Sequence, residues 1–167
     1  MASTEVLIRD VIKNGLIDIG VSKLGFDAGF INVKDYLIEH EIKENISTYL
    51  NSQVNGKKIV RCVAVWVTGS DKFYSMGGNI ERSYEVLIYQ YYEKSVDGVS
   101  VKALLAGANS IREMLTQTLL VDLTGLVDRT DPISAVSIRT RPSVGSKNEL
   151  LEGLTRFTAY KRNATFI

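Results

Sequence analysis

The sequence predicts an α+β domain in which helices pack on one face of a mainly antiparallel β-sheet. Three stretches carry apolar residues at helical spacing. Two other stretches are dense in β-branched and aromatic residues, and two more alternate between apolar and polar residues. The predicted order is helix, helix, strand, strand, helix, strand, strand (α-α-β-β-α-β-β), and such segregated elements are typical of the α+β class.

The first helix is expected to begin near the N-terminus and to end at Gly20. Ser3 or Thr4 can cap it, and Glu5 is favourable in its first turn. Apolar residues then follow helical spacing, at Ile8, Val11, Ile12, Leu16 and Ile19. A second, more polar helix is predicted over residues 36–51.

Two consecutive strands are predicted over residues 59–68 and 84–93. The first is apolar on both faces, so we expect it to be covered on two sides or to lie centrally in the sheet. The second is rich in tyrosine, valine and isoleucine. A polar loop over residues 69–82, which contains Gly77-Gly78, separates them and predicts an antiparallel hairpin.

A third helix and two final strands complete the predicted domain. Ser100 can cap the helix, whose apolar residues recur at i, i+3 and i+4 and form one face for packing on a sheet. Residues 133–141 and 154–162 both alternate, with a polar loop between them. In the last strand Phe157 and Ala159 are expected on one face, and Arg156, Thr158, Tyr160 and Arg162 on the other.

Length and composition indicate one domain over residues 1–167. Of its 167 residues, 45% are hydrophobic and 23% are charged, as in an average globular protein. The net charge of +1 argues against nucleic-acid binding through the overall field of the protein. The N-terminus has no secretory pattern, and no uncharged apolar stretch is long enough to span a membrane, so we expect an intracellular protein.

Few residues offer chemistry typical of an enzyme. The single cysteine, Cys62, lies inside an apolar strand and is expected to be a buried thiol. The single histidine, His40, lies between two glutamates on the second helix, where a solvated side chain is the simpler interpretation. Gly77-Gly78 lacks the lysine and hydroxyl residue of a phosphate-binding loop.

Three aspartates, Asp122, Asp128 and Asp131, follow the third helix. Their oxygens could hold a divalent cation, which would favour a small metal-dependent enzyme. Their spacing is not that of an EF-hand, and turn formation is the commoner role of aspartates. We therefore expect no catalytic residue, no metal site and no cofactor.

Aromatic residues cluster in the hairpin. The strand holds Tyr84, Tyr89, Tyr91 and Tyr92, and the preceding loop holds Phe73 and Tyr74. Neighbouring residues of a strand point to opposite faces, so one face cannot bury all of them. Some are expected in the core, and the rest suit a protein–protein contact, where tyrosine is enriched. The interface candidates are Phe73, Tyr74, Tyr89, Tyr91 and Tyr92.

The C-terminal quarter is basic. Residues 129–163 hold seven basic and three acidic residues, an excess of four in a chain whose total is +1. A solvated sheet face would explain this pattern, and so would a surface that faces an acidic partner or DNA. The candidates for a basic channel or docking surface are Arg139, Arg141, Arg156 and Arg162.

The order of elements resembles a family of bacteriophage proteins. Residues 84–120 form an aromatic strand, a short turn and a long helix with small residues inside it. The helix is followed by Asp131-Pro132 and by a strand that ends in basic residues. The last strand then ends in Phe157-Thr158-Ala159-Tyr160-Lys161-Arg162. This layout resembles the tail terminator and minor capsid (head–tail joining) proteins of tailed phages.

The resemblance implies a structural role in the virion, without catalysis or a cofactor. Such proteins form rings, commonly hexameric, that cap the tail tube and join it to the head connector. We therefore expect a homo-oligomer that contacts the tail tube protein and the neck proteins, with transient contact to passing DNA and none to a membrane. The protein would be assembled in the host cytoplasm. The alternatives from the residues alone are a nucleic-acid-binding or adaptor α+β module.

Overall fold

The computed structural model describes residues 3–20, 33–35, 53–54, 57–58, 61–73, 80–93, 99–121, 125–142 and 149–162. The elements in chain order are α1 (Thr4–Gly20), β1 (Val33–Asp35), β2 (Gln53–Val54), β3 (Lys57–Lys58), β4 (Arg61–Phe73), β5 (Ile80–Glu93), α3 (Val99–Val121), β6 (Arg129–Thr130), β7 (Ser137–Pro142) and β8 (Glu149–Arg162). Helices and strands are both present, so the chain is an α+β protein, as predicted.

Three long antiparallel strands form the centre of the sheet. Its order is β1-β4-β5-β8-β6, and β7 also pairs with β8. β4 pairs with β5 from Arg61 to Phe73, and β5 pairs with β8 over nearly the same length. The short β1 joins β4 in parallel, while β6 and β7 lie antiparallel to two parts of β8. The strand predicted over residues 59–68 is covered on both faces, as one of the two expectations had it, since the neighbours Val63, Ala64 and Val65 are all fully buried.

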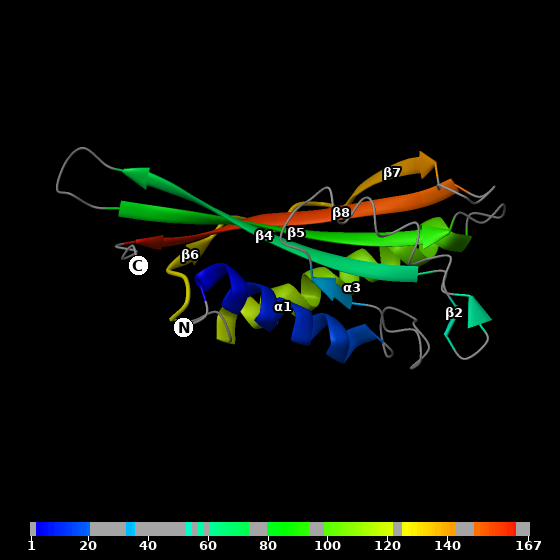
Figure 1. Cartoon of the computed structure of the whole chain (residues 1–167), viewed down its shortest axis with the longest axis horizontal. Helices are drawn as coiled ribbons and strands as arrows, with labels where there is room; N and C mark the ends of the chain where they lie inside the picture. The colour runs from blue at the N-terminus through cyan, green and yellow to red at the C-terminus, as the bar shows by residue number, and fades with distance from the viewer. Residues whose placement is uncertain are drawn as a thin grey trace.

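α1 and α3 lie on the same face of this sheet (Figure 1). Ile8, Ile12 and Leu16 from α1 are fully buried in the core, as are Leu104, Ile111 and Leu115 from α3. They meet the valines of β4 and the alternate apolar residues of β5 and β8. Each fully buried aliphatic side chain contributes about 1.5–3 kcal/mol of transfer free energy. This apolar layer is therefore the main source of the fold's stability.

Two glycines permit close approach within this layer. A Cβ added at Gly15 of α1 would lie 2.6 Å from Sδ of Met114, so Met114 of α3 fills the space that Gly15 leaves. A Cβ at Gly153 of β8 would lie 2.7 Å from Cδ2 of Leu104. α3 therefore packs against β8 directly over a position without a side chain.

The strands differ in length from the prediction. Residues 69–73 and 80–82, predicted as loop, belong to β4 and β5. β8 begins at Glu149 rather than at residue 154, and β7 covers Ser137–Pro142 instead of residues 133–141. Cross-strand pairing carries the ladder through polar residues that have low strand propensity by themselves. The predicted second helix over residues 36–51 lies outside the described residues.

Candidate functional site

The tyrosines of β5 divide between the two faces of the sheet. Tyr84 and Tyr92 belong to the core on the helix side, together with Val86 and Ile88. Tyr89 has the opposite parity along the strand, so it points to the face away from the helices, as does Tyr91. The expectation that one face cannot bury all of the tyrosines therefore holds.

The three tyrosine interface candidates are nevertheless buried. Tyr89, Tyr91 and Tyr92 are only 2–3% exposed. The rings of Tyr89 and Tyr91 stack with centroids 6.0 Å apart, and Oη of Tyr91 donates a hydrogen bond of 2.9 Å to Oε2 of Glu152. Buried tyrosines commonly pair their hydroxyl in this way.

A side chain that contacts a partner must be exposed in the single chain, and Tyr89 and Tyr91 are not, because both faces of β5 are buried at these positions. The side chains of these tyrosines pack inside the protein and contribute to the stability of the sheet. The other two aromatic candidates cannot be placed in the same way. The side chain of Phe73 and the whole of Tyr74 lie outside the described part of the chain.

A polar contact ties the start of α1 to β5 on the helix side. Arg82 makes an ion pair of 3.3 Å with Glu5, and its guanidinium lies 5.8 Å from the ring centre of Tyr84. A Cβ at Gly69 would lie 2.6 Å from Oε1 of Glu5, so this glycine leaves the space that the carboxylate occupies. Burial raises the pKa of Tyr84, against the opposing hydrogen bond with Thr4.

The structure divides the four basic candidates. Arg139 and Arg156 are exposed, and neither forms an ion pair with any other described residue. The side chain of Arg141 lies outside the described residues. Nε of Arg162 lies 3.5 Å from Oε2 of Glu81, so its charge is partly neutralised within the chain. Arg139 and Arg156 are therefore the two described candidates best suited to dock a partner.

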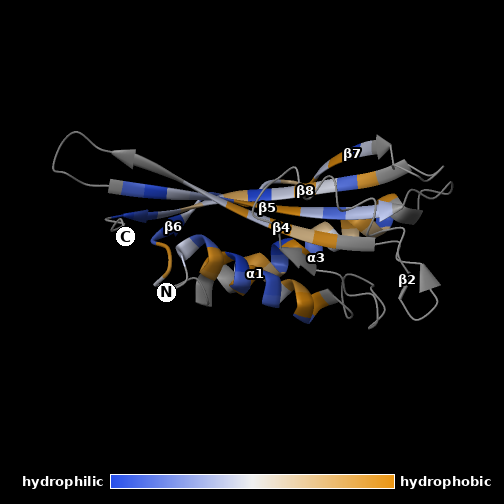
Figure 2. Ribbon diagram, viewed as in Figure 1, coloured by the Kyte–Doolittle hydropathy of each residue, from blue (hydrophilic) through white to orange (hydrophobic). Residues whose placement is uncertain are grey.

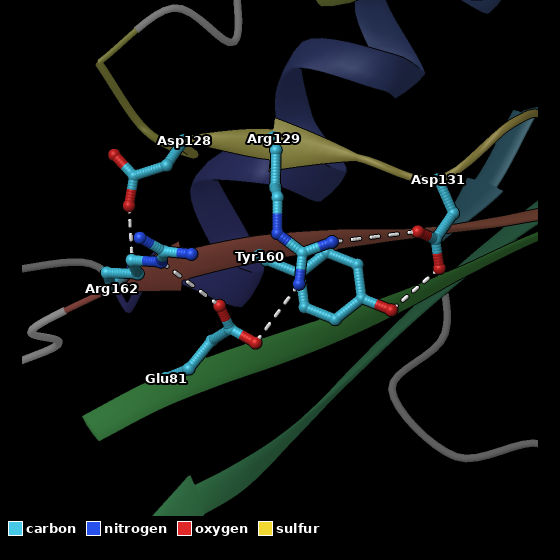
Figure 3. A network of polar contacts seen from close by, with 6 residues as sticks. All are labelled: Glu81, Asp128, Arg129, Asp131, Tyr160 and Arg162. Carbon is cyan, nitrogen blue, oxygen red and sulfur yellow. Dashed lines mark hydrogen bonds and ion pairs between the residues drawn. The ribbon is translucent and has the colours of Figure 1, made fainter. Parts of the chain in front are cut away.

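Arg162 belongs to a polar network on the sheet face away from the helices, which we call the Glu81 cluster (Figure 3). It comprises Glu81, Asp128, Arg129, Asp131, Tyr160 and Arg162. The side chain of Glu81 is only 4% exposed, and Nη2 of Arg129 lies 3.2 Å from its Oε1. A carboxylate withdrawn from water in this way requires cationic partners, and the two arginines supply them.

The aspartates of the Glu81 cluster hold the chain after α3 against β8. Oδ2 of Asp128 accepts a 2.6 Å hydrogen bond from the backbone N–H of Arg162. Oδ2 of Asp131 accepts one of the same length from Oη of Tyr160, and this hydrogen bond is the main reason that the pKa of Tyr160 is raised. The guanidinium of Arg129 lies 3.8 Å from the ring centre of Tyr160.

These contacts bear on the cation site considered from the sequence. Asp128 and Asp131 bind a backbone amide, a phenol and a guanidinium, which are the partners expected of structural aspartates. Asp122 lies outside the described residues. Within the described ranges no group of three or more His, Cys, Asp or Glu side chains is placed to hold a metal ion.

Sequence reasoning missed Glu81 and did not select Arg129 as a site residue. Both belong to charged stretches, Glu81-Arg82 and Asp128-Arg129, that read as loop. Their meeting depends on the pairing of Glu81 with Arg162 and of Arg129 with Tyr160 across three strands. The local sequence offers one indication of this site, which is that Glu81 is a charged residue at the start of an aromatic strand.

The chain from Asp128 to Pro142 runs along one edge of β8. Between β6 and β7 the backbone N–H groups of Asp131 and Ser134 donate to the carbonyls of Thr158 and Arg156, at 2.8 and 2.9 Å. The outermost residues, Ser137 to Thr140, are all exposed. Arginine and proline on an edge strand disfavour pairing with a further strand. This edge therefore suits contacts made through side-chain charge.

The comparisons with known proteins assign no family. No family model matches the sequence, and no curated protein is significantly similar to it. In the described part of the chain, neither helix is long and apolar enough to cross a membrane.

Proposed function

We propose that this protein is a structural subunit of a tailed-phage virion, a tail terminator or neck subunit. In this role copies of the chain form a ring, hexameric in the family it resembles, that caps the tail tube and joins it to the head connector. The observation that carries the proposal is the long antiparallel sheet with both described helices on one face (Figure 1).

The arrangement supports this proposal because it agrees with the layout that the resemblance implies. α1 precedes the sheet, α3 packs across it after the β4–β5 hairpin, and the aromatic and basic β8 ends the described chain. The strands also continue past α1 at one end, which gives each subunit two dissimilar ends (Figure 1). A cyclic ring needs dissimilar patches, since each subunit contacts its two neighbours through different surfaces.

The basic residues have two roles in this proposal. Arg139 and Arg156 face the neck proteins, the tube or passing DNA, because both are exposed and carry charge that no described residue neutralises. Arg162 contributes to the fold through Glu81. Electrostatic contacts of the first kind speed and orient docking and weaken as salt rises.

A charge-reversal experiment tests this division. The variant Arg139→Glu with Arg156→Glu should keep its circular dichroism spectrum and its melting temperature but fail to complement infectivity or to bind tube ends. The matched control is Lys102→Glu with Arg112→Glu, which reverses two exposed charges on α3. Normal particles from the β7–β8 variant would overturn the proposed role of these two arginines.

The alternative is a nucleic-acid-binding or adaptor module that uses the same arginines. It predicts DNA binding by the isolated monomer, with an affinity that falls steeply as salt rises. A monomer that binds DNA in this way, and that never assembles with tube subunits, would favour the alternative over the ring.

A further inference from the structure

The sheet projects beyond the helices at the end that holds the Glu81 cluster (Figure 1). The first turn of α1 covers the sheet as far as Gly69, against which Glu5 lies. Beyond it lie residues 70–73 of β4, 80–83 of β5 and 160–162 of β8, which pair with one another up to Arg162 opposite Glu81. We call these three segments the sheet extension. The printed contact between it and a described helix is the ion pair of Glu5 in α1 with Arg82.

Among the described side chains of the sheet extension, those of residues 81–83 and 160–162, charged and polar groups take the place of aliphatic ones. Figure 2 shows that the ends of β5 and β8 are hydrophilic here, in contrast with the middle of the sheet. Glu81 and Arg82 are adjacent, so they point to opposite faces. The Glu81 cluster holds one face, and the ion pair between Arg82 and Glu5 holds the other.

This construction makes the sheet extension weaker than the core. A small sheet without a hydrophobic face is marginally stable in water. The side chains of Arg129 and Arg162 are 49% and 72% exposed, so water screens each of their ion pairs. When the strands part, the buried carboxylate of Glu81 regains its hydration.

We propose that the sheet extension is a separately opening unit of the fold, held closed by the Glu81 cluster and by the Glu5–Arg82 ion pair. Opening parts the ends of β4, β5 and β8 while the layer of α1, α3 and the middle of the sheet stays folded. It releases backbone donors and acceptors that another strand can pair with. The isolated chain suffices for this behaviour, so the inference does not depend on a virion role.

Hydrogen exchange of the full chain, followed by mass spectrometry, tests the proposal. In the wild type, amides of residues 80–83 should exchange faster than those of residues 86–90. The double variant Arg129→Ala with Arg162→Ala removes the two arginines that form the described ion pairs with Glu81, so exchange in residues 80–83 should rise by about tenfold or more. Exchange in residues 86–90 and the melting temperature should change little.

Two controls sharpen the result. Arg139→Ala removes an exposed arginine that has no described ion pair, and it should leave exchange in the sheet extension unchanged. Glu81→Gln removes the buried charge itself, so it should raise exchange less than the double arginine variant does. The wild type can also be tested with salt. Raising the salt concentration from about 0.1 M to about 1 M screens the exposed arginines, so hydrogen exchange in the sheet extension should become faster.

Three results would overturn the proposal. Equal increases in residues 80–83 and 86–90 would show one cooperative unit. Unchanged exchange in the double variant would show that the Glu81 cluster does not hold the strands together. If the double variant fails to fold, the salt experiment decides, and exchange in the sheet extension that is indifferent to salt would contradict the inference.

Discussion

Replacing Gly153 with alanine tests the packing of α3 on the sheet. The added Cβ would lie 2.7 Å from Cδ2 of Leu104 and 3.1 Å from its Cδ1 and Cγ. Leu104 is fully buried, so it cannot turn into solvent. Overpacking a core costs about 1–3 kcal/mol. The lower conformational entropy of unfolded alanine returns about 0.5–1 kcal/mol. From the midpoints of these two ranges, about 2 and about 0.75 kcal/mol, we expect Gly153→Ala to lower the free energy of unfolding by about 1 kcal/mol.

Urea denaturation followed by circular dichroism measures this loss. The matched control is Gly69→Ala, also in a long strand of the same sheet, where the Cβ would meet the flexible end of Glu5 rather than a packed leucine. Gly69→Ala would at most displace Glu5 from its ion pair with Arg82, so it should lower the free energy of unfolding by no more than the roughly 0–1 kcal/mol of a partly exposed ion pair.

A rescue experiment separates packing from other causes. In a Leu104→Val background the penalty of Gly153→Ala should shrink, because valine lacks the methyl groups nearest to the new Cβ. An alanine variant as stable as the wild type, or a penalty unchanged by Leu104→Val, would refute this account of the interface.

Three further predictions concern buried polar groups. Neither amide atom of Gln90 nor the hydroxyl of Thr155 has a hydrogen-bond partner among the described residues. Gln90→Met and Thr155→Val should therefore each raise the free energy of unfolding in urea by about 1 kcal/mol, and a lower value would reveal a missed partner. Tyr91→Phe deprives the buried Glu152 of a donor and should cost about 1–3 kcal/mol in the same assay, and a neutral result would contradict the role of that hydrogen bond. The pKa of Tyr160 is raised above its ordinary value of 10.0, so the stability that its phenol contributes should be complete below pH 10.0 and be lost as pH rises through the pKa of the folded protein. In Tyr160→Phe the free energy of unfolding should therefore fall less steeply over this alkaline range than in the wild type. Identical alkaline profiles would contradict the bond to Asp131.

The parts of the fold predicted from sequence are those that local spacing determines. α1 and α3 each bury one apolar stripe, and their residues repeat at helical intervals. The β4–β5 hairpin follows from two consecutive runs of β-branched and aromatic residues, whose apolar side chains are buried when the strands pair and pack. In β8, the separation of Phe157 and Ala159 from Arg156 and Arg162 is confirmed by their burial.

The parts that were missed depend on pairing between distant strands. The ends of β4 and β5 contain charged and small residues that resemble a loop, and their partners across the sheet keep them in the ladder. The Glu81 cluster joins residues from three segments, and no single segment contains its pattern. Alternation separated the tyrosines correctly, but it could not indicate that both faces of β5 are buried.

The most direct test of the proposed function is the native mass of the purified protein, measured by native mass spectrometry at two salt concentrations, alone and with tail tube subunits. The account predicts a ring-sized multiple of the 18.5 kDa chain, hexameric if the family resemblance extends to stoichiometry. A strictly monomeric protein under all of these conditions, including those with tube present, would contradict it.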